Sequence, residues 1–223
     1  NFFCNWSIIE RAHRARELLV YIDRPSGQPI AFQLGRLLSP GILQVRSEYR
    51  RTGVGREMVE YCIQLALRND QCLLYIECEP ATSIPFWQRL GFTHLSGDKD
   101  KNYAYRVLEK PLQLPLPGAG AKARVCISFY PEERNWNATL PPYTSSTLDA
   151  MRLSDGTVHL DKRVLFHERA HGQCRDVVVE IEVDGQLLHL GKAKHQQALR
   201  FGLKRCKNGW YVDVLFVAER GDA

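Results

Sequence analysis

Three short apolar runs, separated by residues that favour turns, follow one another in the first part of the chain. Proline beside serine and glycine is typical of tight turns, and short apolar-rich runs between such turns are typical of strands. The pattern predicts three successive strands in an antiparallel meander. The runs are residues 18–22, 30–38 and 42–46, and the turns are residues 25–27 and 39–41.

A helical pattern follows the meander in residues 53–69. Its apolar side chains recur at spacings of three and four and form one stripe: Val54, Met58, Tyr61, Cys62, Leu65 and Ala66. Residues 72–78 then alternate between two faces, as in a strand. A strand–helix–strand unit of this kind predicts a right-handed crossover onto one sheet. Its ligand crevice is expected at the carboxyl ends of the two strands, near Val45 and Glu77.

Shorter elements complete the first half of the chain. Residues 8–17 are charged and contain alanine, which predicts an exposed helix or its end. Ser83 is a favourable N-cap for a short helix that ends before Gly91. Residues 92–95 and 103–109 predict two more strands.

A change of composition marks a domain boundary. The segment at residues 111–121 contains three prolines followed by glycine and alanine, which is typical of a linker. We therefore predict a first domain over residues 1–110, a linker over residues 111–123 and a β-rich C-terminal domain over residues 124–223.

Two hairpin signals characterise the C-terminal domain. Asp184-Gly185 and Asn208-Gly209 each lie between two apolar-rich runs, and both dipeptides suit two-residue turns that match the twist of the strands. The domain is therefore expected to be mainly antiparallel sheet. Residues 124–130 and 157–166 predict further strands, and residues 131–155 predict a long irregular loop.

The segment between the third strand and the long helix has the features of an anion site. Gly53 and Gly55 let the backbone approach a phosphate closely, and the free N–H groups of a first helical turn point toward such a ligand. Arg50 and Arg51 add positive charge beside these donors. The alternative is an ordinary strand-to-helix turn with solvated arginines.

A second motif follows about thirty residues later, at residues 83–92, with the sequence Ser-Ile-Pro-Phe-Trp-Gln-Arg-Leu-Gly-Phe. Together with Arg-x-x-Gly-x-Gly at residues 50–55, it resembles the GNAT family of N-acetyltransferases over residues 8–110. The first motif matches the pyrophosphate loop of that family and the second its short helix that ends in Gly-Phe. The resemblance implies an α/β (α+β) fold, a GNAT-like mixed sheet with flanking helices. The mainly antiparallel β domain, in which we recognise no family, follows it.

The resemblance also implies a co-substrate, acetyl-CoA, and an amine acceptor whose identity the sequence does not give. The N–H of Val45 would face the thioester carbonyl, where losing one oxyanion donor costs about 3–4 kcal/mol. Thr82 or Ser83 would replace a hydrogen bond that the family often takes from asparagine, and Trp87 occupies the position of a frequent tyrosine. The remaining cofactor contacts would come from Leu43, pairing with the pantetheine arm, from Arg50 and Arg51, and from the amides of Gly53, Val54, Gly55 and Arg56.

The sequence motifs identify the general acid and the general base less clearly than the cofactor contacts. An attacking amine must be neutral, which requires a general base, and Glu77 is the candidate because it ends a strand at the crevice. A solvated or ion-paired carboxylate, with a water relay in its place, is the alternative. The indole of Trp87 does not release its proton near neutral pH, so Tyr105 or Tyr103 would protonate the leaving thiolate, or the thiolate leaves unaided. These departures motivate an alternative hypothesis, a non-catalytic acyl-CoA-binding or scaffold protein.

Two further patterns suggest other functions. His167-Glu168-x-x-His171 spells the zinc-binding sequence H-E-x-x-H, but its flanks resemble strands rather than a helix, so a zinc hydrolase is a secondary hypothesis and no metal is expected. A basic cluster at residues 192–207 lies close to aromatic residues, yet a solvated sheet face explains it better than nucleic acid binding does. The C-terminal domain is expected to select the acceptor or a protein partner.

Composition limits the remaining possibilities. The chain has 44% hydrophobic and 25% charged residues, as globular proteins do, and no apolar run approaches the roughly 20 residues that span a bilayer. Seven cysteines without a CxxC spacing predict reduced thiols and a cytoplasmic setting. The net charge of +5 favours an anionic co-substrate without indicating nucleic acid. Because residue 1 is asparagine, the chain is expected to start inside a longer sequence or to have been processed.

Overall fold

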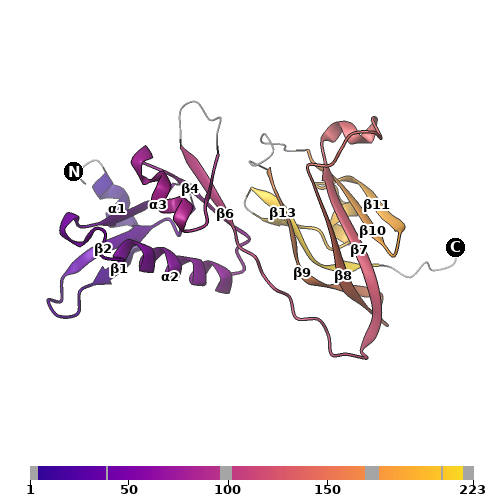
Figure 1. Ribbon diagram of the computed structural model, residues 1–223, viewed down its shortest axis with the longest axis horizontal. Coiled ribbons are helices and arrows are strands. Elements are labelled where there is room, and N and C mark those ends of the chain that lie inside the picture. Colours follow the sequence, from indigo (N-terminus) through magenta and orange to yellow (C-terminus); the bar gives the residue numbers. More distant parts are fainter. Residues whose placement is uncertain (1–4, 39, 96–101, 169–175, 207, 218–223) are drawn as a thin grey trace. The chain divides into compact units, whose positions relative to one another are not determined.

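The computed structural model describes residues 5–38, 40–95, 102–168, 176–206 and 208–217. The chain divides into two compact units, residues 1–108 and residues 109–223, which Figure 1 shows in indigo to magenta and in magenta to yellow. Each unit has its own hydrophobic core. No helix among the described residues is long and apolar enough to cross a membrane.

The first unit begins with a helix and the expected antiparallel meander. Helix α1 packs Ile9 and Ala12 against Leu34, and the three strands that follow pair in the order β1-β2-β3. The meander predicted from the turn residues is therefore confirmed, with shorter strands. The elements are α1 (Trp6–Arg14), β1 (Leu19–Ile22), β2 (Pro29–Leu34) and β3 (Ile42–Val45).

A second small sheet follows, in the order β4-β6-β5. The prediction that the strands before and after the long helix lie in one sheet is wrong, because β3 and β4 belong to different three-stranded sheets. Among the described residues, a parallel bridge between Leu38 and Tyr75 is the one strand pairing that joins these sheets, with Tyr75 N–H donating to Leu37 O at 3.0 Å. The sheet consists of β4 (Leu73–Glu77), β5 (Thr93–His94) and β6 (Tyr103–Val107).

The position of this bridge shows where the pairing between the two segments stops. Leu38 lies in the turn before β3, and β4 ends at Glu77, two residues after its own bridging residue. The two segments are therefore paired at the bridge, before β3 begins, whereas β3 and β4 themselves are not paired with each other. Residues of β3 consequently have an edge that β4 does not cover.

Helices α2 (Val54–Arg68) and α3 (Ile84–Arg89) cover one face of the second sheet. Leu74 and Ile76 of β4 share their core with buried residues of both helices. The stripe predicted for the long helix is buried at Val54, Met58, Cys62 and Ala66. Leu65 is only partly buried, and Tyr61 is 56% exposed. Val59 and Ile63 are buried instead, because α2 packs against two sheets and buries a wider face than a single stripe.

The second unit is a seven-stranded sheet in which every neighbouring pair is antiparallel, in the order β11-β10-β7-β8-β9-β13-β12. The predicted antiparallel domain is therefore confirmed. Its elements are β7 (Gly120–Tyr130), β8 (Thr144–Leu153), β9 (Thr157–His167), β10 (Val178–Val183), β11 (Gln186–Lys192), α4 (Gln196–Arg200), β12 (Lys204–Cys206) and β13 (Gly209–Phe216).

The hairpin signals and the loop prediction had different outcomes. Asp184 and Gly185 have φ values of +53° and +77°, as a two-residue hairpin turn requires, and they join β10 to β11. The second dipeptide begins at Asn208, with φ +62°, and leads into β13. The predicted loop at residues 131–155 is wrong in its second half, where β8 forms.

One side of the large sheet encloses the core of the second unit. Phe129 and Phe166 stack with ring centroids 5.0 Å apart, and both side chains are fully buried. The segment after the unit boundary also joins this sheet, because Leu112 N–H donates to Asp161 O at 3.1 Å and Pro111 bridges Lys162.

His189 gives the second unit a pH-dependent stability. Its side chain is 8% exposed on β11 and lies 5.3 Å from the ring of Phe201, and burial, with a smaller repulsion from His195, lowers its pKa. The unfolded chain binds a proton at this residue below about pH 6.5. In the folded chain the lowered pKa keeps the imidazole neutral to a lower pH. Stability is therefore complete above that pH and falls as the pH drops.

We predict that His189→Asn reduces this pH dependence. The wild type should unfold at lower urea concentration at pH 5.5 than at pH 7.5, and the variant should show a smaller difference between the two values. His159→Asn, at a partly exposed histidine of the same unit, is the matched control and should retain the wild-type difference. An unchanged difference in His189→Asn would contradict the assignment.

Candidate active site

The turn between β3 and α2 leaves the start of a long helix open. Gly53 is the N-cap residue of α2 with φ +99°, a conformation that L residues rarely adopt. No described side chain caps the helix, and the space where a Cβ of Gly53 would lie is empty to 4 Å. The amides of the first turn, in Val54, Gly55 and Arg56, are therefore available to an anion.

The edge of β3 presents backbone groups to the same region. Arg46 N–H donates to Ile30 O at 2.9 Å, so these two residues form a hydrogen-bonded pair of the β2–β3 ladder. Such pairs alternate with non-hydrogen-bonded ones. Val45, opposite Ala31, therefore directs its N–H and C=O away from β2, and Leu43 does the same.

Side chains of three elements meet at this turn. A Cβ on Gly55 would lie 3.5 Å from Val45 Cγ2 and 3.6 Å from Phe86 Cζ, which brings the end of β3, the start of α2 and the middle of α3 together. Sequence reasoning missed Phe86 and singled out Trp87 instead. The signal that could have found it is its spacing of three from Ser83, which places both on one side of a helix.

The predicted arginines lie around the turn as exposed side chains. Arg50 Nε donates to Val45 O at 3.2 Å, so this guanidinium is at the edge of β3. Arg51 has φ +65° and lies next to Thr52 and Gly53. Neither residue is buried, which leaves both charges accessible to an anion at the helix N-terminus.

Ser83 and Trp87 differ in their surroundings. The Oγ of Ser83 is buried and has no hydrogen-bond partner among the described residues, and it does not cap α3. It is therefore a polar atom that could accept or donate a bond to a ligand. Trp87 is 7% exposed and packs edge-to-face against Phe86 and Phe92, so its predicted contact with the cofactor stays a prediction.

Glu77 and Tyr105 belong to a second group of residues. Glu77 is exposed at the end of β4, opposite Tyr103, and Tyr105 pairs with Tyr75. Glu77, Tyr75, Tyr103 and Tyr105 therefore share the sheet face that α2 and α3 do not cover. The rings of Tyr75 and Tyr103 stack on this face, with their centroids 5.0 Å apart.

A carboxylate near the end of β3 is less suited to act as a base. Glu48, in the turn Ser47–Tyr49, has its pKa lowered by the hydrogen bond from its own backbone and then by that from Ser47. A weaker base takes a proton from an amine less readily. Glu77 remains the predicted base.

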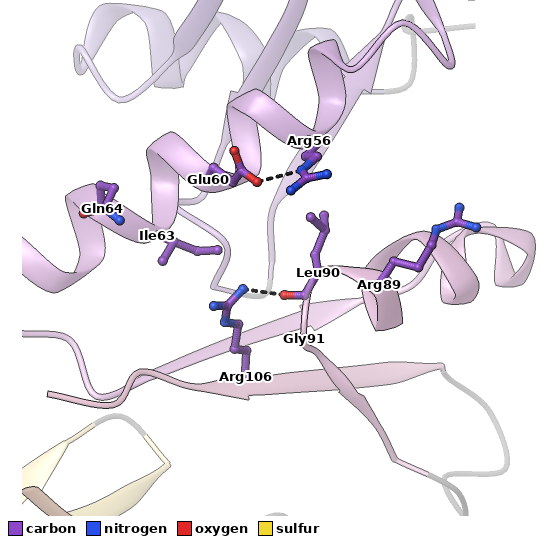
Figure 2. Close-up of a pocket in the computed structure, with 8 residues that line it drawn as sticks. All are labelled: Arg56, Glu60, Ile63, Gln64, Arg89, Leu90, Gly91 and Arg106. Carbon is purple, nitrogen blue, oxygen red and sulfur yellow. Dashed lines mark hydrogen bonds and ion pairs between the residues drawn. The ribbon is translucent and has the colours of Figure 1, made fainter.

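A pocket of about 340 Å³ lies beside these elements. Figure 2 shows that α2 forms one side and that the end of α3 and strand β6 form the other. Three guanidinium groups line it, together with an apolar floor from Ile63 and Leu90. Sequence reasoning missed this pocket, because its arginines, Arg56, Arg89 and Arg106, are far apart in the chain.

The described part of the H-E-x-x-H sequence begins at the end of a strand and not in the α-helix that a zinc site of that type needs. His167 is the last residue of β9, and the carboxylate of Glu168 pairs with the guanidinium of Arg205. His171 lies outside the described residues. Among the described residues no cluster of three or more histidine, cysteine or acidic side chains could hold a metal ion.

Two comparisons with known proteins found similar sequences. Residues 14–94 match the model of the acetyltransferase (GNAT) domain family, a range that contains β3, the glycine turn, α2 and α3. An uncharacterized N-acetyltransferase of Bacillus subtilis (strain 168), YitH, is 27% identical over 173 residues, which are 77% of this chain and 52% of that protein.

The chain therefore spans about half the length of this relative. Because the first unit ends at Leu108, an alignment of 173 residues must extend into the second unit. The likeness consequently covers parts of both units, whereas the family match lies within the first. The first unit is therefore similar to GNAT acetyltransferase domains over residues 14–94.

Proposed function

We propose that this protein is an acetyltransferase, which moves an acetyl group from acetyl-CoA to an amine by direct attack of the amine on the thioester. The observation that carries the proposal is that two sets of unused backbone donors lie close together. One set is the first turn of α2 and the other is the edge of β3. They meet where Val45, Gly55 and Phe86 adjoin. A diphosphate and an extended amide-containing arm, as in acetyl-CoA, match these two sets.

The fit of the co-substrate follows from the local geometry. Pyrophosphate oxygens would accept hydrogen bonds from the amides of Gly53 to Arg56, and Arg50 and Arg51 would offset their charge. The pantetheine arm would lie along β3 and pair with the outward groups of Leu43 and Val45. The buried Oγ of Ser83 would bond to an amide of the arm.

The reaction needs one oxyanion donor and two proton transfers. The N–H of Val45 would stabilise the oxyanion as the amine nitrogen bonds to the thioester carbon. Glu77, directly or through a water, would accept the proton that the amine loses. The carbon–sulfur bond then breaks, and the thiolate of CoA leaves with a proton from Tyr105 or leaves as the anion.

The position of Trp87 favours a second candidate, a protein that binds acyl-CoA without transferring the acyl group. An indole buried in the core supplies no proton where the family often has tyrosine. The two candidates differ in one assay, the release of CoA thiol in the presence of a panel of amines. Amine-dependent release supports the transferase, whereas binding without release for every amine supports the second candidate.

Gly53→Asp should abolish tight binding of acetyl-CoA. The new carboxylate would lie in the open space at the helix N-terminus and repel the diphosphate, so the dissociation constant measured by calorimetry should rise at least tenfold, about 1.4 kcal/mol. Gly118→Asp is the matched control, since Gly118 has φ +89° and equally open surroundings but lies outside the first unit. Equal loss of binding in both variants would count against the phosphate turn.

Val45→Pro should lower kcat by about 10²–10³-fold, the typical effect of removing one oxyanion donor. The N–H of Val45 points away from β2, so proline removes this donor without removing a bond of the ladder. Val45→Ala keeps the N–H and is the control, with a kcat close to that of the wild type. A proline variant with unchanged kcat would show that another group binds the oxyanion.

The two glycines of the turn should respond oppositely to alanine. Gly53→Ala forces an L residue to φ +99° and should destabilise the first unit by about 1–2 kcal/mol. Gly55→Ala adds a Cβ at ordinary contact distance from Val45 and Phe86 and should stabilise α2 by up to about 1 kcal/mol. Urea denaturation followed by tryptophan fluorescence measures both, with buried Trp87 reporting on the first unit and buried Trp210 on the second. Changes of equal sign in the transition of the first unit would contradict the assigned backbone geometry.

A further inference from the structure

The first turn of α2 contains one acidic residue, Glu57, beside the amides that are available to an anion. A negative charge near a helix N-terminus is attracted to it, whether the charge belongs to a side chain or to a ligand. Because Cα–Cβ bonds in a helix lean toward its N-terminus, the side chain of Glu57 leans toward the free N–H groups. A freely moving carboxylate at this position would compete with an anionic ligand and repel it.

The hydroxyl of Tyr21 holds this carboxylate. It donates to Glu57 Oε2 at 2.5 Å, and within the described part of the chain the side chain of Glu57 has no further hydrogen-bond or ion-pair partner. The hydrogen bond to Glu57 raises the pKa of Tyr21, so the phenol keeps its proton and donates at neutral pH. With the carboxylate held in this way, it does not cap α2, and the space beside Gly53 is open to 4 Å.

The meander presents Tyr21 to the start of the helix. Tyr21 of β1 lies opposite Ala31 of β2, and Ala31 lies opposite Val45 of β3, so the three side chains share one face of the sheet. The ring of Tyr21 packs there in one cluster with Val54 and Met58 of α2. Packing of the ring therefore fixes the place of the hydroxyl beside the first turn of the helix.

We propose that Tyr21 is a positioning residue of the co-substrate site, whose hydroxyl holds the carboxylate of Glu57 away from the diphosphate of acetyl-CoA. The inference rests on the proposed use of acetyl-CoA. A diphosphate and a carboxylate repel each other appreciably at separations of about 5–10 Å, even where water screens them. Tyr21 consequently acts on binding through Glu57 and contacts neither the co-substrate nor the reacting atoms.

Tyr21→Phe keeps the packed ring and removes the hydroxyl. Calorimetry on the full chain should give a dissociation constant for acetyl-CoA about three- to tenfold higher than that of the wild type. Because salt screens the repulsion, this difference should shrink when the salt concentration is raised from about 0.05 M to about 0.5 M. In assays of acetyl transfer KM should rise while kcat stays unchanged, since the interaction concerns binding and not the chemical step.

Tyr49→Phe is the matched control. The ring of Tyr49 packs against the same apolar cluster as that of Tyr21, but its hydroxyl has no hydrogen-bond partner among the described residues. This variant should bind acetyl-CoA as the wild type does. Urea denaturation of both tyrosine variants should give midpoints close to that of the wild type, because a partly exposed hydrogen bond contributes little to stability.

Glu57→Gln separates the electrostatic role from a purely structural one. The substitution removes the negative charge, so the variant should bind acetyl-CoA at least as tightly as the wild type. The double variant Tyr21→Phe with Glu57→Gln should bind like Glu57→Gln alone, since the hydroxyl then has no charge to hold. Such a rescue is not expected if Tyr21 only supports the packing of α2 on the sheet.

The outcomes separate this inference from the proposed function. A wild-type dissociation constant in Tyr21→Phe would overturn the role of Tyr21 and leave the transferase proposal standing. A loss of binding that does not depend on salt, or that Glu57→Gln does not restore, would equally overturn it. Absence of acetyl-CoA binding by the wild type would overturn the proposed function, and the inference with it.

Discussion

The first unit depends on an α-helix whose N-terminal amides the protein does not use. A helix start leaves four N–H groups without intrahelical partners, and side chains such as serine or aspartate normally satisfy some of them. Here Gly53 occupies the N-cap and no described side chain replaces the missing bonds. The helix remains stable because its other residues, Val54 and Met58 among them, are buried against β-strands, so packing compensates for an end that is open to a ligand.

The separation of β3 from β4 gives the second half of the site. If the two strands paired along their full length, their facing N–H and C=O groups would satisfy one another and no extended ligand could bind between them. The contact is instead limited to the turn at Leu37 and Leu38, which bonds to Tyr75. The two sets of unused donors thus have separate origins, a helix start and an open strand edge, and they adjoin at the strand–turn–helix junction.

Local sequence signals predicted much of this junction, and long-range features escaped them. The glycines, the helical stripe and the hairpin dipeptides act within a few residues, so the turn, α2 and the β10–β11 hairpin could be foreseen. Strand β8 was missed because its outward residues, such as Ser145 and Thr147, are polar, and only Leu148 and Ala150 reach the core. The split between the sheets, the position of Phe86 and the three-arginine pocket depend on how distant segments pack, which periodicity does not encode.

The same limit applies to the segment between the units, where composition alone suggested a free linker. Strand β13 has an irregular register around Asp213, between the pairs Val212–Val164 and Val214–His159. The residues of β9 between His159 and Val164 bond instead to residues 110–112. Arg163 N–H donates to Lys110 O, and Leu112 N–H donates to Asp161 O.

Arg163 of β9 stabilises the irregular part of β13 through its side chain. Its guanidinium donates to both carboxylate oxygens of Asp213, at 2.7 and 2.6 Å, and lies 4.2 Å from the ring centre of Tyr211. A side chain that is 2% exposed must have its charge compensated in this way. The irregular strand therefore creates a binding place for residues 110–112, so the start of the proline-rich segment is part of the second unit's sheet.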